Sequence, residues 1–109
     1  MKWRIIMEQN NEKIIVRVDP DLEELIPGFL QRRHEDIVAI ADALKKDDYE
    51  TVRILGHSMK GSGGGYGFDA ISNIGRIIEQ AAKDKNLAEI QKQAHELSTY
   101  LGRIEIRYH

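Results

Sequence analysis

Apolar side chains recur every three or four residues in four stretches of this 109-residue chain, and short polar joints separate the stretches. The stretches begin at Pro27, at Asp47 or Asp48, near Phe68 and Asp69, and after Asn86; the first ends around Lys45 and Lys46, and the last reaches about Leu101. This spacing puts one apolar stripe on each of four helices. Joints as short as KKDD and KDKN favour antiparallel neighbours. The sequence therefore predicts an all-α fold, an antiparallel four-helix bundle.

The ends of the chain differ from this pattern. Asp19 before Pro20 predicts a short N-terminal helix through DLEEL. Residues 1–18 contain two β-branched runs, WRIIME and KIIVRV, around a polar QNNE joint, which indicates a hairpin or an extended arm. We expect this arm to pack on the bundle formed by residues 19–109, because apolar side chains such as Trp3 and Val16 are costly to expose. A partner-binding strand and a shield over an exposed end are alternatives, and residues 102–109 fit either a strand or more helix.

Charge and residue types exclude several classes of function. The net charge of −2 gives no electrostatic basis for binding nucleic acid. The chain has no cysteine, so disulfides, thiolate metal sites and thiol nucleophiles are excluded. The sequence has neither an apolar run of membrane-spanning length nor the long hydrophobic segment of a signal peptide. We therefore expect a cytoplasmic protein.

The third helix carries a histidine on its polar face. At 100° per residue the inward stripe consists of Val52, Leu55, Met59, Ser62 and Tyr66. His57 lies two residues from both Leu55 and Met59, about 160° away from that stripe. The imidazole is therefore predicted to face solvent.

Five glycines occupy the seven positions that follow Lys60, in GSGGGYG. Each glycine destabilises a helix by roughly 1 kcal/mol relative to alanine, so a run of glycines indicates a structural or functional requirement for small residues. Gly61 and Gly64 share the exposed face, where bare backbone lets a bulky object come close to the imidazole. Gly63 and Gly65 lie nearer the other faces, where small size lets neighbouring helices approach, and Gly67 is expected to end the helix.

The charges around His57 suit phosphoryl chemistry. Arg53 and Lys60 lie one turn before and one turn after it. An imidazole with an ordinary pKa of about 6.5 is mostly neutral at physiological pH, and its free lone pair is a competent nucleophile toward phosphorus. A lysine one turn away can offset the negative charge of an attached phosphoryl group.

These residues resemble the signature of histidine-containing phosphotransfer domains, the intermediates of bacterial phosphorelays. The resemblance is carried by the motif His57-x-x-Lys60-Gly61-Ser62-x-x-x-x-Gly67, by the preceding helix TVRILG and by the following segment FDAISNIGRIIEQAA. It covers approximately residues 20–101.

The resemblance implies a four-helix bundle that carries a phosphoryl group and has no independent turnover. His57 is then phosphorylated by a histidine kinase or hybrid kinase and exchanges the group with an aspartate of a response-regulator receiver domain. Lys60 corresponds to the lysine that supports the phosphate, Gly61 to the glycine that gives clearance, and Gly67 to the turn glycine. Glu79 matches an acidic position to which we assign only a structural role. The chain needs no cofactor of its own, Mg²⁺ is expected from the receiver domain, and we expect a monomer.

Two other classes of function fit the sequence poorly. A P-loop needs its lysine after the glycines and a strand before them, whereas here Lys60 precedes the glycines within a helix. A metal site would draw on the four histidines, but none of them forms the HxxxH pair that puts two imidazoles on one helix face. The remaining competitor is a helical interaction module that is never phosphorylated. Ile54 lies about 60° from His57, at the rim of a docking face that both this module and a carrier would use.

Overall fold

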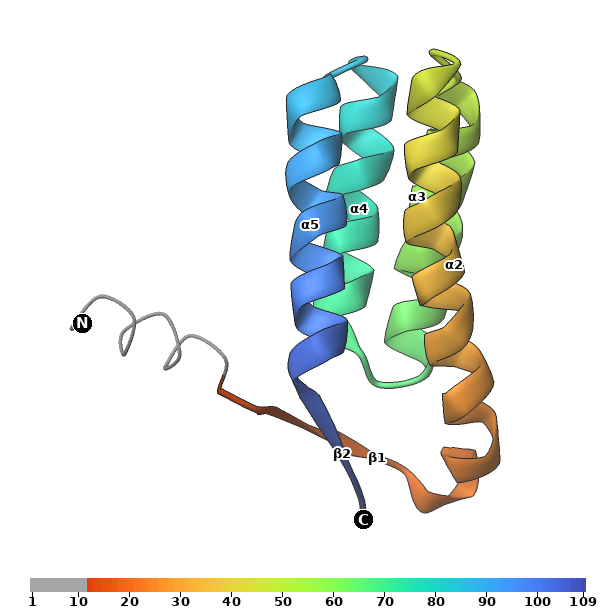
Figure 1. Cartoon of the computed structure of the whole chain (residues 1–109). Coiled ribbons are helices and arrows are strands. Elements are labelled where there is room, and N and C mark those ends of the chain that lie inside the picture. Colours follow the sequence, from red (N-terminus) through yellow and green to blue (C-terminus); the bar gives the residue numbers. More distant parts are fainter. Residues whose placement is uncertain (1–11) are drawn as a thin grey trace, which may run out of the picture.

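The computed structural model describes residues 12–109, which form a helical bundle with a small sheet at one end (Figure 1). In chain order the elements are β1 (Ile14–Val18), the 3-10 helix η1 (Pro20–Leu25), α2 (Ile26–Lys45), α3 (Tyr49–Gly65), α4 (Asp69–Lys83), α5 (Leu87–Arg103) and β2 (Ile104–Tyr108). The predicted antiparallel four-helix bundle is confirmed. The short N-terminal helix is confirmed as well, in 3-10 form.

The helices begin where the sequence supplies side-chain caps. Asp48 Oδ1 accepts a hydrogen bond from the backbone N–H of Thr51 at 3.0 Å, at the start of α3. Asn86 Oδ1 does the same for the backbone N–H of Glu89 at 3.1 Å, at the start of α5. These oxygens satisfy amide groups that have no partner inside the helix.

The turn from α3 to α4 depends on Gly67. Its φ of +90° is a conformation that residues with side chains rarely adopt. The backbone N–H of Phe68 then donates to Gly63 O at 2.8 Å and closes the turn. α3 ends at Gly65 with Tyr66 as its C-cap, so Gly67 is the positive-φ glycine that follows the last helical turn and ends the helix, as predicted.

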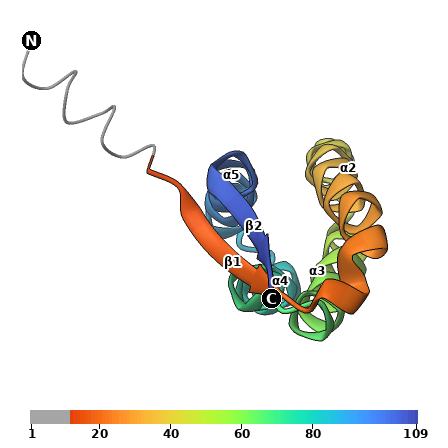
Figure 2. The same ribbon diagram turned by 90° about the horizontal axis from the view of Figure 1, so that it is seen from below.

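Glycines bring α3 and α4 into close contact. A Cβ on Gly56 would lie 2.7 Å from the backbone nitrogen of Glu79, and a Cβ on Gly63 would lie 2.6 Å from that of Ser72. No side chain fits in either gap. Seen along the bundle, α3 and α4 lie together while α2 and α5 stand farther apart (Figure 2).

The core lies between the four helices. Its fully buried side chains, with relative exposure below 2 %, are Ile26, Phe29, Ile40, Val52, Met59, Phe68, Ile71, Ile78, Ile90 and Leu97. The Phe29 and Phe68 rings stack with centroids 5.3 Å apart. None of the helices among the described residues is long and apolar enough to cross a membrane.

β1 and β2 form a two-stranded parallel sheet that pairs the segment before the bundle with the segment after it (Figure 1). Ile14 is paired with Ile104 and Val18 with Tyr108. Val18 is buried, and Val16 packs against the core. The last residues, which the sequence left open between helix and strand, are helical to Arg103 and extended from Ile104. The part of the predicted arm that contains Trp3 and the first β-branched run lies outside the described residues.

Candidate functional site

His57 stands on the outer face of α3 with 66 % of its side chain exposed. The inward neighbours Val52 and Met59 are fully buried, which follows from the helical period of the segment. The imidazole ring is therefore open to large molecules on one side, while the backbone of His57 is held in place by a packed helix.

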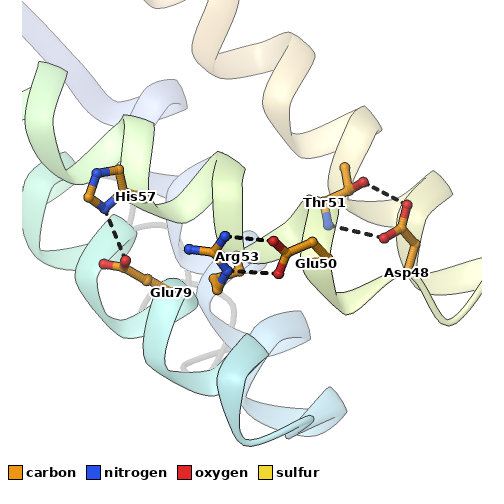
Figure 3. A network of polar contacts seen from close by, with 6 residues as sticks. All are labelled: Asp48, Glu50, Thr51, Arg53, His57 and Glu79. Atoms are coloured by element: carbon orange, nitrogen blue, oxygen red, sulfur yellow. Dashed lines mark hydrogen bonds and ion pairs between the residues drawn. The ribbon is translucent and has the colours of Figure 1, made fainter.

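Glu79 of α4 points toward His57 (Figure 3). Its Oε2 lies 3.0 Å from His57 Nδ1, and its Oε1 forms an ion pair with Lys60 Nζ, also at 3.0 Å. Only 8 % of Glu79 is exposed. One buried carboxylate thus joins the histidine and the lysine, which the sequence places one helical turn apart.

The packing of α3 on α4 explains why Glu79 reaches this position. Gly56 and Gly75 meet where the two helices touch: a Cβ on Gly75 would lie 2.7 Å from Gly56 O. Because the two helices run antiparallel, Glu79 lies opposite Gly56, whose added Cβ would be 2.7 Å from the backbone nitrogen of Glu79, and Lys60 lies opposite Gly75. Glu79 is therefore level with the turn of α3 that carries His57. The structural role that we assigned to Glu79 from the sequence is therefore incomplete. The i, i+4 spacing of Gly75 and Glu79 was the signal available.

The contacts of Glu79 keep its carboxyl group ionised. The hydrogen bond from Lys60 lowers the pKa of Glu79 below its ordinary value of 4.5, and the contact with His57 acts in the same direction. Burial opposes this effect, and the net direction is downward. At neutral pH Glu79 is an anion that only accepts hydrogen bonds.

This charge determines which ring nitrogen of His57 carries the proton. An ionised carboxylate has no hydrogen to donate, so Nδ1 must donate across the 3.0 Å contact. In the neutral ring, Nε2 then holds the free lone pair. Chemically, the arrangement is an exposed nucleophile oriented by a buried anion.

Arg53 and Ile54 flank the histidine on the N-terminal side. The Nε and Nη2 atoms of Arg53 donate to Glu50 Oε1 and Oε2 at 2.8 and 2.6 Å (Figure 3). This pairing lowers the pKa of Glu50 and raises that of Arg53. Ile54 is 53 % exposed, an apolar side chain on an otherwise polar helix face.

The glycines beyond His57 differ in whether they face solvent or pack against another helix, and one of them departs from the sequence prediction. Gly61 meets no atom within 4 Å of an added Cβ, and Gly64 meets only Ser72 Oγ, at 3.9 Å. Gly63 packs against α4 as expected. Gly65 does not: an added Cβ there would also meet nothing within 4 Å. The prediction that Gly65 serves helix packing is wrong, because its side of α3 faces no other helix. The exposed side of α3 therefore has bare backbone at Gly61, Gly64 and Gly65.

A buried arginine ties α2 to α3 beside this region. Arg33 is 6 % exposed, its Nη1 donates to Ser62 Oγ at 2.6 Å, and its Nε forms an ion pair with Asp36 Oδ2 at 2.8 Å. Its guanidinium carbon also lies 4.9 Å from the centre of the Phe29 ring. Ser62, which belongs to the glycine-rich run, is thus anchored to the bundle. Sequence reasoning missed Arg33, because it stands in the charged run QRRHED, and runs of this kind usually face solvent.

Comparison with known proteins adds a family assignment. A family model described as the Hpt domain matches residues 24–106. The match covers the full length of all four long helices, and it contains His57, Lys60 and Glu79. No curated protein and no solved structure matches the chain significantly.

Proposed function

The chain belongs to the Hpt domain family, and from this membership we propose that His57 accepts a phosphoryl group and exchanges it with an aspartate of a response-regulator receiver domain. Members of this family act in phosphorelays as phosphotransfer carriers rather than classical enzymes, and they generally interact with kinases and receiver domains. The proposal assigns this role to particular atoms of this chain.

The observation that supports it best is the contact between His57 Nδ1 and Glu79. With Nδ1 protonated, the Nε2 lone pair attacks the phosphorus atom of an aspartyl phosphate. The new N–P bond forms as the bond between phosphorus and the aspartate oxygen breaks, and the aspartate leaves as a carboxylate. The ring becomes more positive in this step, and the Glu79 carboxylate offsets that charge. The reverse step returns the phosphoryl group and the original imidazole.

Lys60 supports the phosphoryl oxygens in this proposal. Its side chain is 40 % exposed and starts one turn beyond His57, so Nζ can turn from Glu79 toward a group attached to Nε2. Phosphoryl transfer depends mainly on positioning and on neutralising negative charge, which a lysine provides as a point charge.

The receiver domain supplies the rest of the chemistry. Among residues 12–109, the Glu79 carboxylate is engaged by His57 and Lys60, and the nearby carboxylate of Glu50 is paired with Arg53. We propose that Mg²⁺ and the acidic pocket that holds it belong to the receiver, and that the chain itself has no independent turnover. The bare backbone at Gly61 and Gly64 gives the receiver room to bring its aspartate to Nε2.

The decisive experiment incubates the purified chain with a phosphorylated receiver domain and maps the labelled residue. We expect acid-labile label on His57, and none on a His57→Gln variant with unchanged circular dichroism and thermal melting. An interaction module that is never phosphorylated would show no label on the wild type and little change in partner binding in the variant. That result would refute the proposal that the chain is a phosphoryl carrier.

A further inference from the structure

β1 has an edge without a strand partner among the described residues. The sheet there consists of β1 and β2 alone, in the order β1-β2. The backbone N–H of His109 donates to Val18 O at 3.1 Å, so the backbone groups of Val18 face β2. Because alternate residues of a strand direct their backbone groups to opposite sides, those of Ile15 and Arg17 face away from β2. These donors and acceptors can pair with a further strand.

Several features of this edge favour an added strand. Ile15 is 51 % exposed on the outer face of the sheet. Parallel sheets are normally covered on both faces, and sheets of two strands have little stability of their own. An open edge is a template for another strand. Figure 2 shows the sheet beneath one side of the bundle, with β2 leading out of α5 and β1 beside it.

We propose that β1 pairs antiparallel with β1 of a second copy of the chain, about a twofold axis at Val16. The two sheets then join into one sheet of four strands. In this register Ile15 lies opposite Arg17 of the second copy, so the outward backbone groups of both strands face each other. Arg17 Nη1 lies 2.8 Å from His109 Nε2 of its own chain, and the aliphatic stem of this arginine lies beside the exposed isoleucine of the second copy. The sequence alone had suggested a monomer.

Charge selects this register over its neighbours. With the axis at Ile15, Lys13 would lie opposite Arg17 of the second copy. With the axis at Arg17, the two Arg17 side chains would face each other. Both arrangements oppose like charges, which destabilises a strand pair. The axis at Val16 instead sets Lys13 opposite Asp19 of the second copy, and both residues are exposed in the structure.

This contact is separate from phosphotransfer. β1 lies before the residues matched by the Hpt family model, and it contributes none of the side chains around His57. A strand pair buries less surface than a standard interface, so we expect a dimer that dissociates on dilution. Its failure would leave the proposed carrier function untouched.

Single cysteines test the register, because the chain has none of its own. At the axis, a Val16→Cys pair would be a directly opposed pair without hydrogen bonds between its residues, with Cα atoms about 4.5 Å apart, within the range of a disulfide. Two Ile15→Cys residues would be diagonal neighbours about 7–8 Å apart, beyond that range. Oxidation should therefore link Val16→Cys into a dimer faster than Ile15→Cys. Ile106→Cys on β2 serves as the control for the other edge.

The mass of the wild-type chain in solution provides the second measurement. Light scattering after gel filtration should show a shift from one chain to two with rising concentration. Ile15→Pro removes an N–H that faces the open edge, so it should abolish the dimer while circular dichroism and thermal melting stay unchanged. A monomer at every concentration, equal cross-linking at residues 15 and 16, or faster cross-linking at Ile106→Cys would each overturn the proposal.

Discussion

A Cβ atom added to Gly75 of α4 would lie 2.5 Å from the backbone nitrogen of Lys60 on α3. Real Cβ atoms do not approach other atoms so closely, so the two helix backbones touch at this level. One turn along α4, Glu79 reaches His57 and Lys60. The glycine contact and the polar contact are therefore parts of one arrangement, in which packing sets the distance across which the carboxylate acts.

Replacing Gly75 by alanine should force α3 and α4 apart. We expect a loss of about 1–3 kcal/mol in the free energy of unfolding, typical of overpacked sites, measured by urea denaturation. Phosphotransfer to His57 should fall as well, because the carboxylate of Glu79 is displaced. Gly102→Ala is the matched control, since an added Cβ there meets nothing within 4 Å. Equal stability of Gly75→Ala and the wild type would mean that the helices are not in contact.

Gly61→Ala should have the opposite effect on stability. The position lies within α3 and has room for a methyl group, so alanine should stabilise the helix by up to about 1 kcal/mol. Transfer from a phosphorylated receiver should nevertheless slow, since the methyl group stands where the partner must approach. Gly102→Ala should show a gain in stability without the loss of transfer. Unchanged transfer rates in Gly61→Ala would remove the argument for clearance.

The glycines also show how far sequence reasoning reaches. The helical period located His57 and the face it shares with Gly61 and Gly64, because angles around one helix follow from residue number. Residue number does not tell which neighbouring helix, if any, packs against each of the other faces. Gly63 meets α4 and Gly65 meets nothing, although both were expected to serve packing.

Two further features depended on contacts between distant segments. Glu79 is 22 residues from His57, and their contact needs the close approach of α3 and α4. The strand at Ile104–Tyr108 has apolar residues that fit helix and strand equally, and pairing with β1 decides between them. Alternating segments of this kind take their state from tertiary contacts.

Variants at Glu79 should change the tautomer of His57. In Glu79→Ala, Nδ1 loses its acceptor, and ¹⁵N NMR of the neutral ring should show a smaller fraction with the proton on Nδ1. Glu79→Gln keeps an oxygen that can accept the same hydrogen bond, so it should retain more of this tautomer while losing the negative charge. The same tautomer ratio in all three proteins would show that Glu79 does not orient the ring.

Removing Arg33 should destabilise the bundle strongly. Arg33→Ala leaves Asp36, whose side chain is 14 % exposed, without its cation, and leaves Ser62 Oγ without a donor. Breaking one half of a buried ion pair costs about 3–5 kcal/mol. The exposed neighbour supplies a control, since Arg32→Ala should change the free energy of unfolding by no more than about 0.5 kcal/mol.

A double variant separates the two causes of this loss. Arg33→Met combined with Asp36→Asn leaves no unpaired charge, and it should lose less stability than Arg33→Ala alone. Urea denaturation of these three variants and of the wild type measures the difference. If the double variant were the less stable of the two, the unpaired carboxylate would not be the source of the loss.

Acid should remove the contribution of Glu79 to stability. The pKa of Glu79 in the folded protein lies below its ordinary value of 4.5, which we take for the unfolded chain. Between these two pKa values the unfolded chain binds a proton that the folded chain does not, so lowering the pH favours unfolding. The contribution is complete above the unfolded pKa and disappears as the pH falls through the folded pKa.

The difference between wild type and Glu79→Gln isolates this effect, because Asp48 and Glu50, whose pKa values are also lowered, are present in both proteins. Urea denaturation from about pH 7 to about pH 3 should show a constant difference in unfolding free energy down to the unfolded pKa and a shrinking one below it. Gly102→Ala, which changes no charge, should keep a constant difference from the wild type throughout. Parallel curves for wild type and Glu79→Gln across the acid range would mean that Lys60 and His57 do not hold the carboxylate in its charged form.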